Sequence, residues 1–435
     1  MKMSVIGCGY LGAVHAASMV KLGHEVVGID VDNAKIEALA AGQSPIYEPG
    51  LPELLVESVG SGRLTFSTDP AAAKGSKVHF VAVGTPQKAG SYAADLRFVD
   101  AAVQGLLPYL SEGDLVVGKS TVPVGTAERL AKMVEPTGAR LAWNPEFLRE
   151  GFAVKDTISP DRLVYGLPAD AGDAARAKAL LDEVYAEALA ADTPLVSTDY
   201  ATAELVKVAA NAFLATKISF INAMAEISEA TGADVTQLAD AIGYDARIGR
   251  RFLNAGAGFG GGCLPKDIRA FSARAEELGK GEALNFLKEV DGINLRRRDR
   301  VVELVVEALG GSAYNKKVAV LGLAFKPDSD DIRDSPSLDV AVRLNGLGAN
   351  VVASDPQAIA NSRRMHPQLV FGTTEEALRD ADAVVVVTEW KEYRELDPKA
   401  VGEMVTSKIV IDGRNCLDVA AWRDAGWKYT GMGRR

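Results

Sequence analysis

The sequence predicts an α/β fold with two Rossmann-like, doubly wound parallel sheets joined by a long central helical region. Two observations carry this prediction: short apolar runs alternate with helical patterns in the first and last parts of the chain, and residues 199–231 contain almost no helix breaker. Because 435 residues are too many for one hydrophobic core, several domains are expected. We predict domains at residues 1–198, 199–310 and 311–435.

The composition narrows the class of protein. Hydrophobic residues make up 48% of the chain and charged residues 24%, which is typical of a soluble globular protein, and a net charge of -10 argues against general nucleic-acid binding. Cys8, Cys263 and Cys416 lie far apart, lack a metal-binding spacing and favour a reducing compartment. The N-terminus has no signal pattern, and polar residues interrupt the longest apolar run, at 213–227. We therefore expect a cytoplasmic protein that binds no metal, membrane or nucleic acid.

The first strand is expected at residues 3–6, and a G-x-G-x-x-G turn at 7–12 follows it. A helix runs to about residue 22, and a second strand, at 25–29, ends at Asp30. This strand–turn–helix setting with an acid about 20 residues on is the dinucleotide-binding pattern. The first two glycines allow close approach to a pyrophosphate, and the third allows the helix to pack on the strand. Because Asp30 would bind ribose hydroxyls and repel a ribose phosphate, NAD is favoured over NADP.

Further strands are expected at residues 78–83, 115–119, 140–143 and 163–165. Ligands bind at the carboxyl ends of such strands, where three segments stand: 84–86, 119–123 and 144–150. In the last of these, Asn144 suits a helix N-cap and Glu146 a first-turn acid. Glu150 would then lie one turn further along the same face, so a paired-carboxylate role is the alternative to simple capping.

An alanine-rich linker helix is expected at residues 171–191, followed by the long helix at 199–231. Lys207 and Asn211 lie four residues apart in that largely apolar helix. They are either a solvated edge with a snorkelling lysine or a polar pair with buried partners. A helix that is apolar on several sides also predicts packing against another subunit.

The most informative stretch is residues 258–267, Gly-Phe-Gly-Gly-Gly-Cys-Leu-Pro-Lys-Asp. Its glycines bring the backbone close to a ligand or another segment. Pro265 suits the first turn of a helix, so Cys263 would lie at a helix N-terminus near Lys266, where a thiolate is favoured. The alternative is a buried, unreactive cysteine. The coincidence of the glycines, the helix start and Lys266–Asp267 favours a reactive thiol.

A second α/β unit is expected, with strands at residues 317–321, 350–353, 383–387 and 409–411. We interpret the acidic segment 328–334 as a solvated loop, because it lacks the glycine and glutamate of a calcium loop. Arg414 follows a strand end and suits a phosphate. The arginines at 296–300 are interpreted as an exposed helix face.

Taken together, these segments closely resemble the UDP-glucose/GDP-mannose dehydrogenase family over essentially the full chain. The resemblance is carried by residues 7–12, 119–123, 144–148, 207–213, 258–267 and 412–414, with Phe325, Lys326 and Arg333. Two positions depart from the family pattern: Gly262 replaces a usual serine, and Leu264 replaces a usual aromatic residue.

The resemblance implies a four-electron oxidation of a sugar primary alcohol to a carboxylate with two NAD molecules. Cys263 would capture the intermediate aldehyde as a thiohemiacetal that becomes a thioester. Lys207 and Asn211 would stabilise oxyanions, Glu146 would act as general base, Asp267 would activate water and Thr121 would support it. The region from Arg247 to Cys263 looks most like the branch that uses UDP-glucose.

The resemblance also implies binding residues, and it places Arg247 in a neighbouring subunit's site, so that a homodimer or larger homo-oligomer is expected. The implied cofactor ligands are Gly7, Gly9, Tyr10, Leu11, Gly12, Asp30, Lys35, Thr85, Thr121, Glu150, Lys266 and Arg333. The implied sugar-nucleotide ligands are Glu146, Phe147, Leu148, Lys207, Asn211, Arg247, Phe252, Leu253, Gly260, Phe325, Lys326 and Arg414.

Three other functions remain open. The same chemistry fits GDP-mannose or a UDP-N-acetylhexosamine. A two-electron β-hydroxyacid dehydrogenase shares a dinucleotide domain and a catalytic lysine, but it needs neither Cys263 nor a second sheet domain. A nucleotide-sugar sensor would bind without turnover, and Cys263, Lys207 and Asp267 argue against it.

Overall fold

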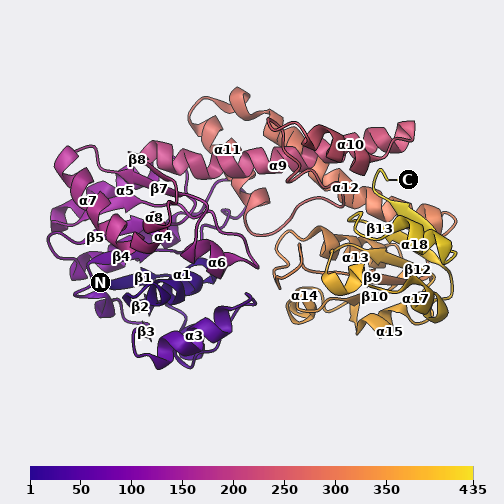
Figure 1. Ribbon diagram of the computed structural model, residues 1–435, viewed down its shortest axis with the longest axis horizontal. Coiled ribbons are helices and arrows are strands. Elements are labelled where there is room, and N and C mark those ends of the chain that lie inside the picture. The colour runs from indigo at the N-terminus through magenta and orange to yellow at the C-terminus, as the bar shows by residue number, and fades with distance from the viewer. Residues whose placement is uncertain (435) are drawn as a thin grey trace. The chain divides into compact units, whose positions relative to one another are not determined.

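The computed structural model describes residues 1–434 and divides into two compact units, each with its own sheet (Figure 1). Unit 1 comprises Met1–Ala210 and Glu276–Leu278, and unit 2 comprises Asn211–Ala275 and Gly279–Arg435. The boundary falls inside helix α9 (Tyr200–Thr231), which begins within one residue of the predicted start.

Unit 1 contains an eight-stranded sheet in the order β3-β2-β1-β4-β5-β6-β7-β8. The strands are β1 (Lys2–Ile6), β2 (Glu25–Ile29), β3 (Leu64–Ser67), β4 (Val78–Val81), β5 (Leu115–Gly118), β6 (Arg140–Trp143), β7 (Leu163–Leu167) and β8 (Leu195–Asp199). Neighbouring strands are parallel except β6 and β7, which pair antiparallel through Trp143 and Gly166. The predicted parallel sheet is therefore confirmed for β1 to β6, and only the predicted strand at 163–165 runs antiparallel to its neighbour β6.

Helices cover both faces of this sheet. They are α1 (Tyr10–Lys21), α2 (Asn33–Ala40), α3 (Leu51–Gly60), α4 (Arg97–Leu106), α5 (Thr126–Val134), α6 (Ala153–Ile158), α7 (Ala171–Val184) and α8 (Ala186–Ala190). The predicted linker helix at 171–191 is instead α7 and α8, which bury Ala177, Leu181 and Val184 in the core. The segment expected to lead directly into α9 is the edge strand β8.

The glycine turn after β1 confirms the packing role predicted for its third glycine. A Cβ atom added to Gly12 would lie 1.7 Å from the carbonyl oxygen of Gly7, so no other residue fits there without moving the turn. Helix α1 can therefore begin directly at the end of β1, with its first amides facing the carboxyl edge of the sheet.

Unit 2 contains a six-stranded, wholly parallel sheet in the order β11-β10-β9-β12-β13-β14. The strands are β9 (Lys317–Leu321), β10 (Asn350–Ser354), β11 (Val370–Phe371), β12 (Ala383–Val386), β13 (Ile409–Asp412) and β14 (Lys428–Gly431). The four predicted strands are confirmed, and the two missed strands are the edges.

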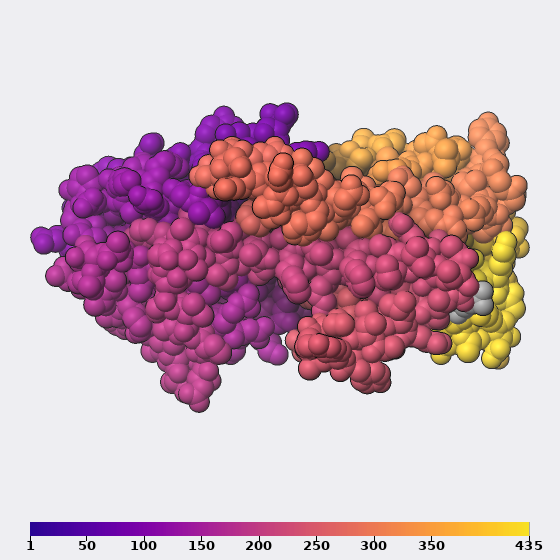
Figure 2. Space-filling model, turned by 90° about the horizontal axis from the view of Figure 1, so that it is seen from above, coloured from indigo at the N-terminus to yellow at the C-terminus, as the bar shows by residue number. Residues whose placement is uncertain are grey.

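The helices of unit 2 include those that precede its sheet. They are the second part of α9, α10 (Val235–Gly243), α11 (Leu264–Glu277), α12 (Phe286–Ala308), α13 (Pro336–Gly346), α14 (Ile359–Met365), α15 (Thr374–Leu378), α16 (Lys391–Arg394), α17 (Pro398–Met404) and α18 (Val419–Asp424). The Val235 amide at the start of α10 donates to the Gly433 carbonyl at 2.8 Å, and Figure 2 shows the yellow C-terminal residues against this crimson segment.

The arginine cluster on α12 is only partly the exposed face that we predicted, because Arg296 is exposed but two of its neighbours are not. Arg297 and Arg298 are buried, with exposed fractions of 0% and 4%. Arg297 pairs with Glu229 at 2.9 Å, and Arg298 pairs with Asp334 at 2.8 Å. These partners are distant in sequence, so local charge patterning gave no sign of them.

Helix α9 is long and apolar enough to cross a membrane by length and composition alone, a test that core helices of soluble proteins also pass. Glu204, Lys207 and Asn211 are buried along it, and each needs a polar partner. Glu204 accepts hydrogen bonds from the amides of Gly125 and Ala127, at 2.7 and 2.6 Å, at the start of α5. These contacts are typical of a helix that packs within a folded protein.

Candidate active site

The glycine turn and the end of β2 form the predicted dinucleotide site in unit 1. Asp30 accepts hydrogen bonds from the Cys8 amide at 2.8 Å and from the Asp32 amide at 3.0 Å, and it pairs with Lys35 at 2.9 Å. Burial raises the pKa of Asp30, but these hydrogen bonds and Lys35 outweigh burial and lower it overall. Asp30 is therefore an ionised acceptor where a ribose would bind, and Lys35 lies beside it.

The N-terminus of α1 is suited to a phosphate. Its N-cap, Gly9, offers no side-chain hydrogen bond, and a Cβ atom added there would meet open space. The first amides of a helix without a capping side chain form an anion site. Cys8, beside them, is buried, and burial followed by the charge of Asp30 raises its pKa to about 12, so this thiol fills space beside the turn and is not a reactive group.

Tyr10 and Glu48 tie the glycine turn to the segment before α6. The Tyr10 hydroxyl donates to the buried Glu48 carboxylate, which also accepts the amides of Gly151 and Ala153, both at 2.7 Å. Burial, followed by the hydrogen bond to Glu48, raises the pKa of Tyr10. Glu48 was not predicted, because its partners lie about a hundred residues further along the chain.

Two predicted threonines meet at the carboxyl edge of the same sheet. The buried Thr85, after β4, donates its hydroxyl to the Thr121 carbonyl, after β5, at 2.8 Å. The sheet thus brings together two segments that the sequence placed at strand ends.

Glu146 and Lys207 form an ion pair, with 3.0 Å between Oε1 and Nζ. Lys207 is only 5% exposed and lies 5.6 Å from the centroid of the Phe147 ring. The snorkelling interpretation of Lys207 was therefore wrong, and the interpretation of a buried, partnered lysine is confirmed. The second Glu146 oxygen accepts the Leu148 amide at 2.8 Å.

The segment that carries Glu146 is not a helix, although its residues suggested a helix start. Residues 144–149 are irregular, and α6 begins only at Ala153. Asn144 is not an N-cap: its Oδ1 accepts from Lys119 and Tyr185, and its Nδ2 donates to Val164 at 3.0 Å. Glu150 therefore does not lie one helical turn beyond Glu146, and the geometric basis for a helical carboxylate pair is removed.

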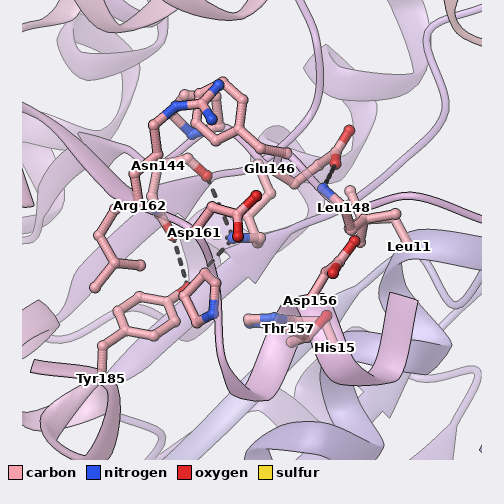
Figure 3. A pocket seen from close by; sticks show the side chains of 15 residues that line it. Leu11, His15, Asn144, Glu146, Leu148, Asp156, Thr157, Asp161, Arg162 and Tyr185 are labelled. Carbon is pink, nitrogen blue, oxygen red and sulfur yellow. Dashed lines mark hydrogen bonds between the residues drawn. The ribbon is translucent and has the colours of Figure 1, made fainter. Parts of the chain in front are cut away.

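A cavity of about 50 Å³ lies behind Glu146 (Figure 3). His15, Asn144, Glu146, Arg162 and Tyr185 line it from different elements. Arg162 stacks on the Phe147 ring, with 3.8 Å from Cζ to the centroid. Phe147, a predicted sugar-nucleotide ligand, is thus held between two cationic side chains, Arg162 and Lys207.

Cys263 lies in unit 2 and is exposed, directly before the first residue of α11. The Cys263 carbonyl accepts the first helical hydrogen bond, from the Asp267 amide, at 2.9 Å. The predicted position of Cys263 at a helix N-terminus is therefore confirmed, and the alternative of a buried cysteine is excluded. The thiol can be reached by a substrate.

Asp267 and Asn211 form a buried polar contact beside this cysteine. Asp267 is 2% exposed and accepts from Asn211 Nδ2 at 2.6 Å, while its other oxygen pairs with Lys266 at 2.7 Å. The polar face of α9 and the first turn of α11 thus share one hydrogen bond. It brings a carboxylate, an amide and an ammonium together within one turn of the thiol.

The glycines before Cys263 pack against protein in unit 2. Gly258 has a φ of 99°, and a Cβ there would lie 2.4 Å from Asn294 Oδ1; Asn294 also bonds both backbone groups of Phe259. A Cβ on Gly260 would lie 2.4 Å from the Asp334 carbonyl. At Gly262, where the family usually has serine, a Cβ would lie 2.3 Å from Arg333 Cζ. The Arg333 guanidinium, which also binds Asp331, thus lies against the residue next to Cys263.

The acidic segment 328–334 is not simply a solvated loop, because two of its carboxylates bind arginines. One binds arginines of α11 and α12, and the other binds an arginine of the segment itself. Asp334 pairs with Arg269 at 3.0 Å and with Arg298, and Asp331 pairs with Arg333 at 2.6 Å. In residues 1–434, no group of three or more metal-binding side chains is placed to hold an ion.

Arg414 joins three segments around the predicted nucleotide site. It donates to the carbonyls of Val387 at 2.8 Å, Gly258 at 2.7 Å and Phe325 at 3.2 Å. Lys326 lies 5.5 Å from the Phe325 ring centroid. Phe325, Lys326 and Arg414 are therefore neighbours, although residues 326 and 414 are far apart in sequence.

The segment after α10 carries the remaining predicted ligands. Arg247 is exposed and pairs with Asp245 at 2.6 Å, and Phe252 is 39% exposed with a φ of 65°. Leu253 is buried. Of the predicted ligands in this segment, only Arg247 and Phe252 face solvent.

The comparison with known proteins covers the whole chain. Three models of the UDP-glucose/GDP-mannose dehydrogenase family match: the NAD binding domain at residues 1–189, the central domain at 201–296 and the UDP binding domain at 319–419. UDP-glucose 6-dehydrogenase of Rhizobium meliloti (strain 1021) is 40% identical over the full length of both chains. The protein TuaD of Bacillus subtilis (strain 168), also a UDP-glucose 6-dehydrogenase, is 40% identical over 100% of this chain and 93% of its own.

Two solved structures are also similar to this chain over its full length. The UDP-glucose dehydrogenase of Pyrobaculum islandicum superimposes with a TM-score of 0.88 at 39% identity, covering 100% of this chain and 98% of its own. The UDP-D-ManNAc dehydrogenase of Pyrococcus horikoshii has a TM-score of 0.85 at 27% identity, and the match covers 100% of this chain and 99% of its own. From its full-length match to all three family domains, the chain belongs to the UDP-glucose/GDP-mannose dehydrogenase family.

Proposed function

We propose that this protein oxidises UDP-glucose to UDP-glucuronate in two successive two-electron steps, with Cys263 as the covalent nucleophile. The observation that carries the proposal is the exposed thiol at the start of α11, one turn from the buried Asn211–Asp267 contact. Full-length similarity to enzymes named for UDP-glucose supports this sugar nucleotide.

The cofactor fits the residues present in unit 1. The α1 amides would hold the pyrophosphate, and Asp30 and Lys35 would bind the adenosine ribose. NAD, when bound, accepts one hydride per oxidation step, so two molecules are consumed per sugar. Thr85, Thr121, Glu150, Lys266 and Arg333 complete the proposed cofactor contacts.

The first step needs a base for the proton of the sugar hydroxyl. In the proposal, Glu146 accepts this proton. Lys207, which forms an ion pair with Glu146, stabilises the negative charge that develops on the sugar oxygen. The product of this step is an aldehyde.

The second step needs the thiol. The Cys263 thiol adds to the aldehyde carbon while its proton passes to the aldehyde oxygen, and the thiohemiacetal then loses a hydride from carbon and the hydroxyl proton to give a thioester. Asn211 would stabilise the oxyanion, and Asp267 would take a proton from the water that releases the carboxylate and restores the thiol. An amide donor of this kind contributes about 3 kcal/mol.

Assembly into a homodimer through α9 is part of the proposal. Phe213, Phe220 and Ile227 recur every seven residues on this helix and are 67%, 49% and 58% exposed. An apolar stripe at this spacing suits a second helix. Arg247, exposed on the segment after α10, would then reach a neighbouring sugar-nucleotide site. The composition and the buried polar groups of α9 support a cytoplasmic location.

A substrate panel tests the function. Purified protein would be incubated with NAD and UDP-glucose, GDP-mannose, UDP-N-acetylglucosamine or UDP-N-acetylmannosamine, and NADH would be counted per sugar consumed. Two NADH with UDP-glucose is expected. One NADH per substrate would indicate a two-electron dehydrogenase, and binding without NADH would indicate a sensor. A stronger response to another sugar nucleotide would reassign the substrate.

A further inference from the structure

Lys119 is a buried lysine that the proposed mechanism leaves without a role. It directly follows β5 and is 6% exposed. Its Nζ donates to the Asn144 side-chain oxygen at 2.9 Å, to the Asn144 carbonyl at 3.4 Å and to the Tyr185 hydroxyl at 3.2 Å. The Tyr185 hydroxyl in turn donates to the same Asn144 oxygen at 2.6 Å.

All three acceptors of Lys119 are uncharged. Burial of its ammonium group therefore lowers the stability of the folded protein. Buried ammonium groups are usually paired with a carboxylate. Here the cation instead lies 5.8 Å from the ring centroids of both Phe80 and Tyr185. Burial, reinforced by the charge of Lys207 and opposed by that of Glu146, lowers the pKa of Lys119 to about 8. A methionine would fill the same space without the free-energy cost of burying a charge, so the presence of a lysine at this position needs another explanation.

The group that Lys119 holds is the segment leading to Glu146. Asn144 is two residues before Glu146, and residues 144–149 have no helix or strand to fix them. Lys119 binds both the backbone and the side chain of Asn144, whose Nδ2 is fixed to Val164. The neighbouring Pro145 restricts the chain further. The position of Glu146 opposite Lys207 therefore depends on this buried anchor.

We propose that Lys119 is a positioning residue for Glu146, which fixes the 144–146 segment and places a positive charge near the base. The inference rests on the proposed function, in which Glu146 is the base. The other ionisable side chains that line the cavity beside Glu146 are His15, Asp156, Asp161, Arg162 and Tyr185, and Lys207 pairs with Glu146.

The test compares Lys119→Met with Lys132→Met. Lys132 is an exposed lysine on α5 that pairs with Glu128, one helical turn away. For Lys119→Met we expect kcat to fall about 10- to 100-fold while the KM for NAD stays within about twofold. The pH profile of kcat/KM should also change, because a charged group near the proposed base is removed. Lys132→Met should match the parent in all three.

Tyr185→Phe is the milder second variant if Lys119→Met does not fold. It keeps the ammonium but removes one of its acceptors and one donor to Asn144, so a kcat loss of about three- to tenfold with unchanged NAD binding is expected. An active parent together with a folded Lys119→Met variant whose kcat and pH profile are unchanged would overturn the inference. A parent that forms no NADH from any sugar nucleotide would instead overturn the proposed function.

Discussion

Asn211 Nδ2 donates a 2.6 Å hydrogen bond to Asp267 Oδ2, and both side chains are buried within unit 2. The bond joins α9 to the first turn of α11, where Cys263 precedes the helix. In the proposed reaction, the amide that would stabilise the oxyanion and the carboxylate that would activate water are thus fixed relative to each other before any substrate binds.

Asp267→Asn should therefore impair the late, hydrolytic step of the proposed reaction. The variant keeps the shape of the side chain but cannot take a proton from water, so kcat should fall about 100-fold or more. Mass spectrometry during turnover should show sugar attached to Cys263, because the thioester accumulates. A free thiol with an unchanged rate would contradict the role of Asp267.

Cys263→Ser should abolish uronate formation while NAD still binds, because the nucleotide turn lies in unit 1. Alkylation of the native protein with iodoacetamide should modify Cys263 and spare Cys8 and Cys416. Cys263 is exposed, whereas burial and then the charge of Asp412 raise the pKa of Cys416. Uronate production by the serine variant, measured by chromatography, is the outcome that would refute covalent catalysis.

Gly262→Ser restores the residue usual in the family and should disturb Arg333, since a Cβ would lie 2.3 Å from its guanidinium carbon. Because a long side chain can swing away, we expect a change in the KM for NAD of about two- to fivefold with little change in kcat. Gly249→Ala is unsuitable as a control because of its φ of 69°, whereas Gly105→Ala meets open space within α4. Equal kinetics for the Gly262 and Gly105 variants would show that Arg333 does not contact the cofactor.

Lys119 should leave a signature in the pH dependence of stability. Its folded pKa of about 8 lies below the ordinary 10.5, so between these pH values the unfolded chain keeps a proton that the folded protein releases. The free energy of unfolding of the parent should therefore rise relative to Lys119→Met by up to about 1.4 kcal/mol per pH unit in this window. Urea denaturation at pH 7, 8, 9 and 10 measures the difference, and a constant difference would contradict a depressed pKa.

Phe213→Asp should convert the proposed dimer to monomers, because a charge in an apolar helix pair is unfavourable. Sedimentation velocity gives the molar mass, with the exposed Phe98→Asp on α4 as the matched control. Arg247→Ala should keep the dimer and weaken UDP-glucose binding, measured by calorimetry. Unchanged affinity would argue against a contribution from the neighbouring subunit.

Most of the fold could be predicted from local patterns, and the failures have a common cause. Continuous apolar runs identified the central strands, but the edge strands β3, β8 and β11 are short and half exposed, so they carry no such signal. The segment at 144–150 has the residues of a helix start, yet Lys119 and Tyr185 use Asn144 for tertiary contacts. In both cases the structure depends on contacts with distant parts of the chain, which the local pattern does not show.

In the candidate site, too, local motifs identified some residues, whereas residues that act through distant contacts were missed. Motifs placed Cys263, Asp267, Lys207 and Glu146, and the structure confirms which of them are buried and which pair within a unit. The supporting roles of Glu48, Lys119 and Asn294 in neighbouring segments were not predicted, because their contacts span 25 to 105 residues. A single sequence offers little to connect such pairs.

Glu204 caps α5 through Gly125 and Ala127, which fastens the start of α9 to the chain segment just after Thr121. Lys207 follows Glu204 by less than one helical turn, so its reach toward Glu146 is set by the same anchorage. The proposed base and its lysine partner are therefore held by contacts within unit 1. If the proposed sugar-nucleotide ligands are right, sugar preference can change through Arg247 and Phe252, because these exposed side chains can be exchanged without moving Glu146.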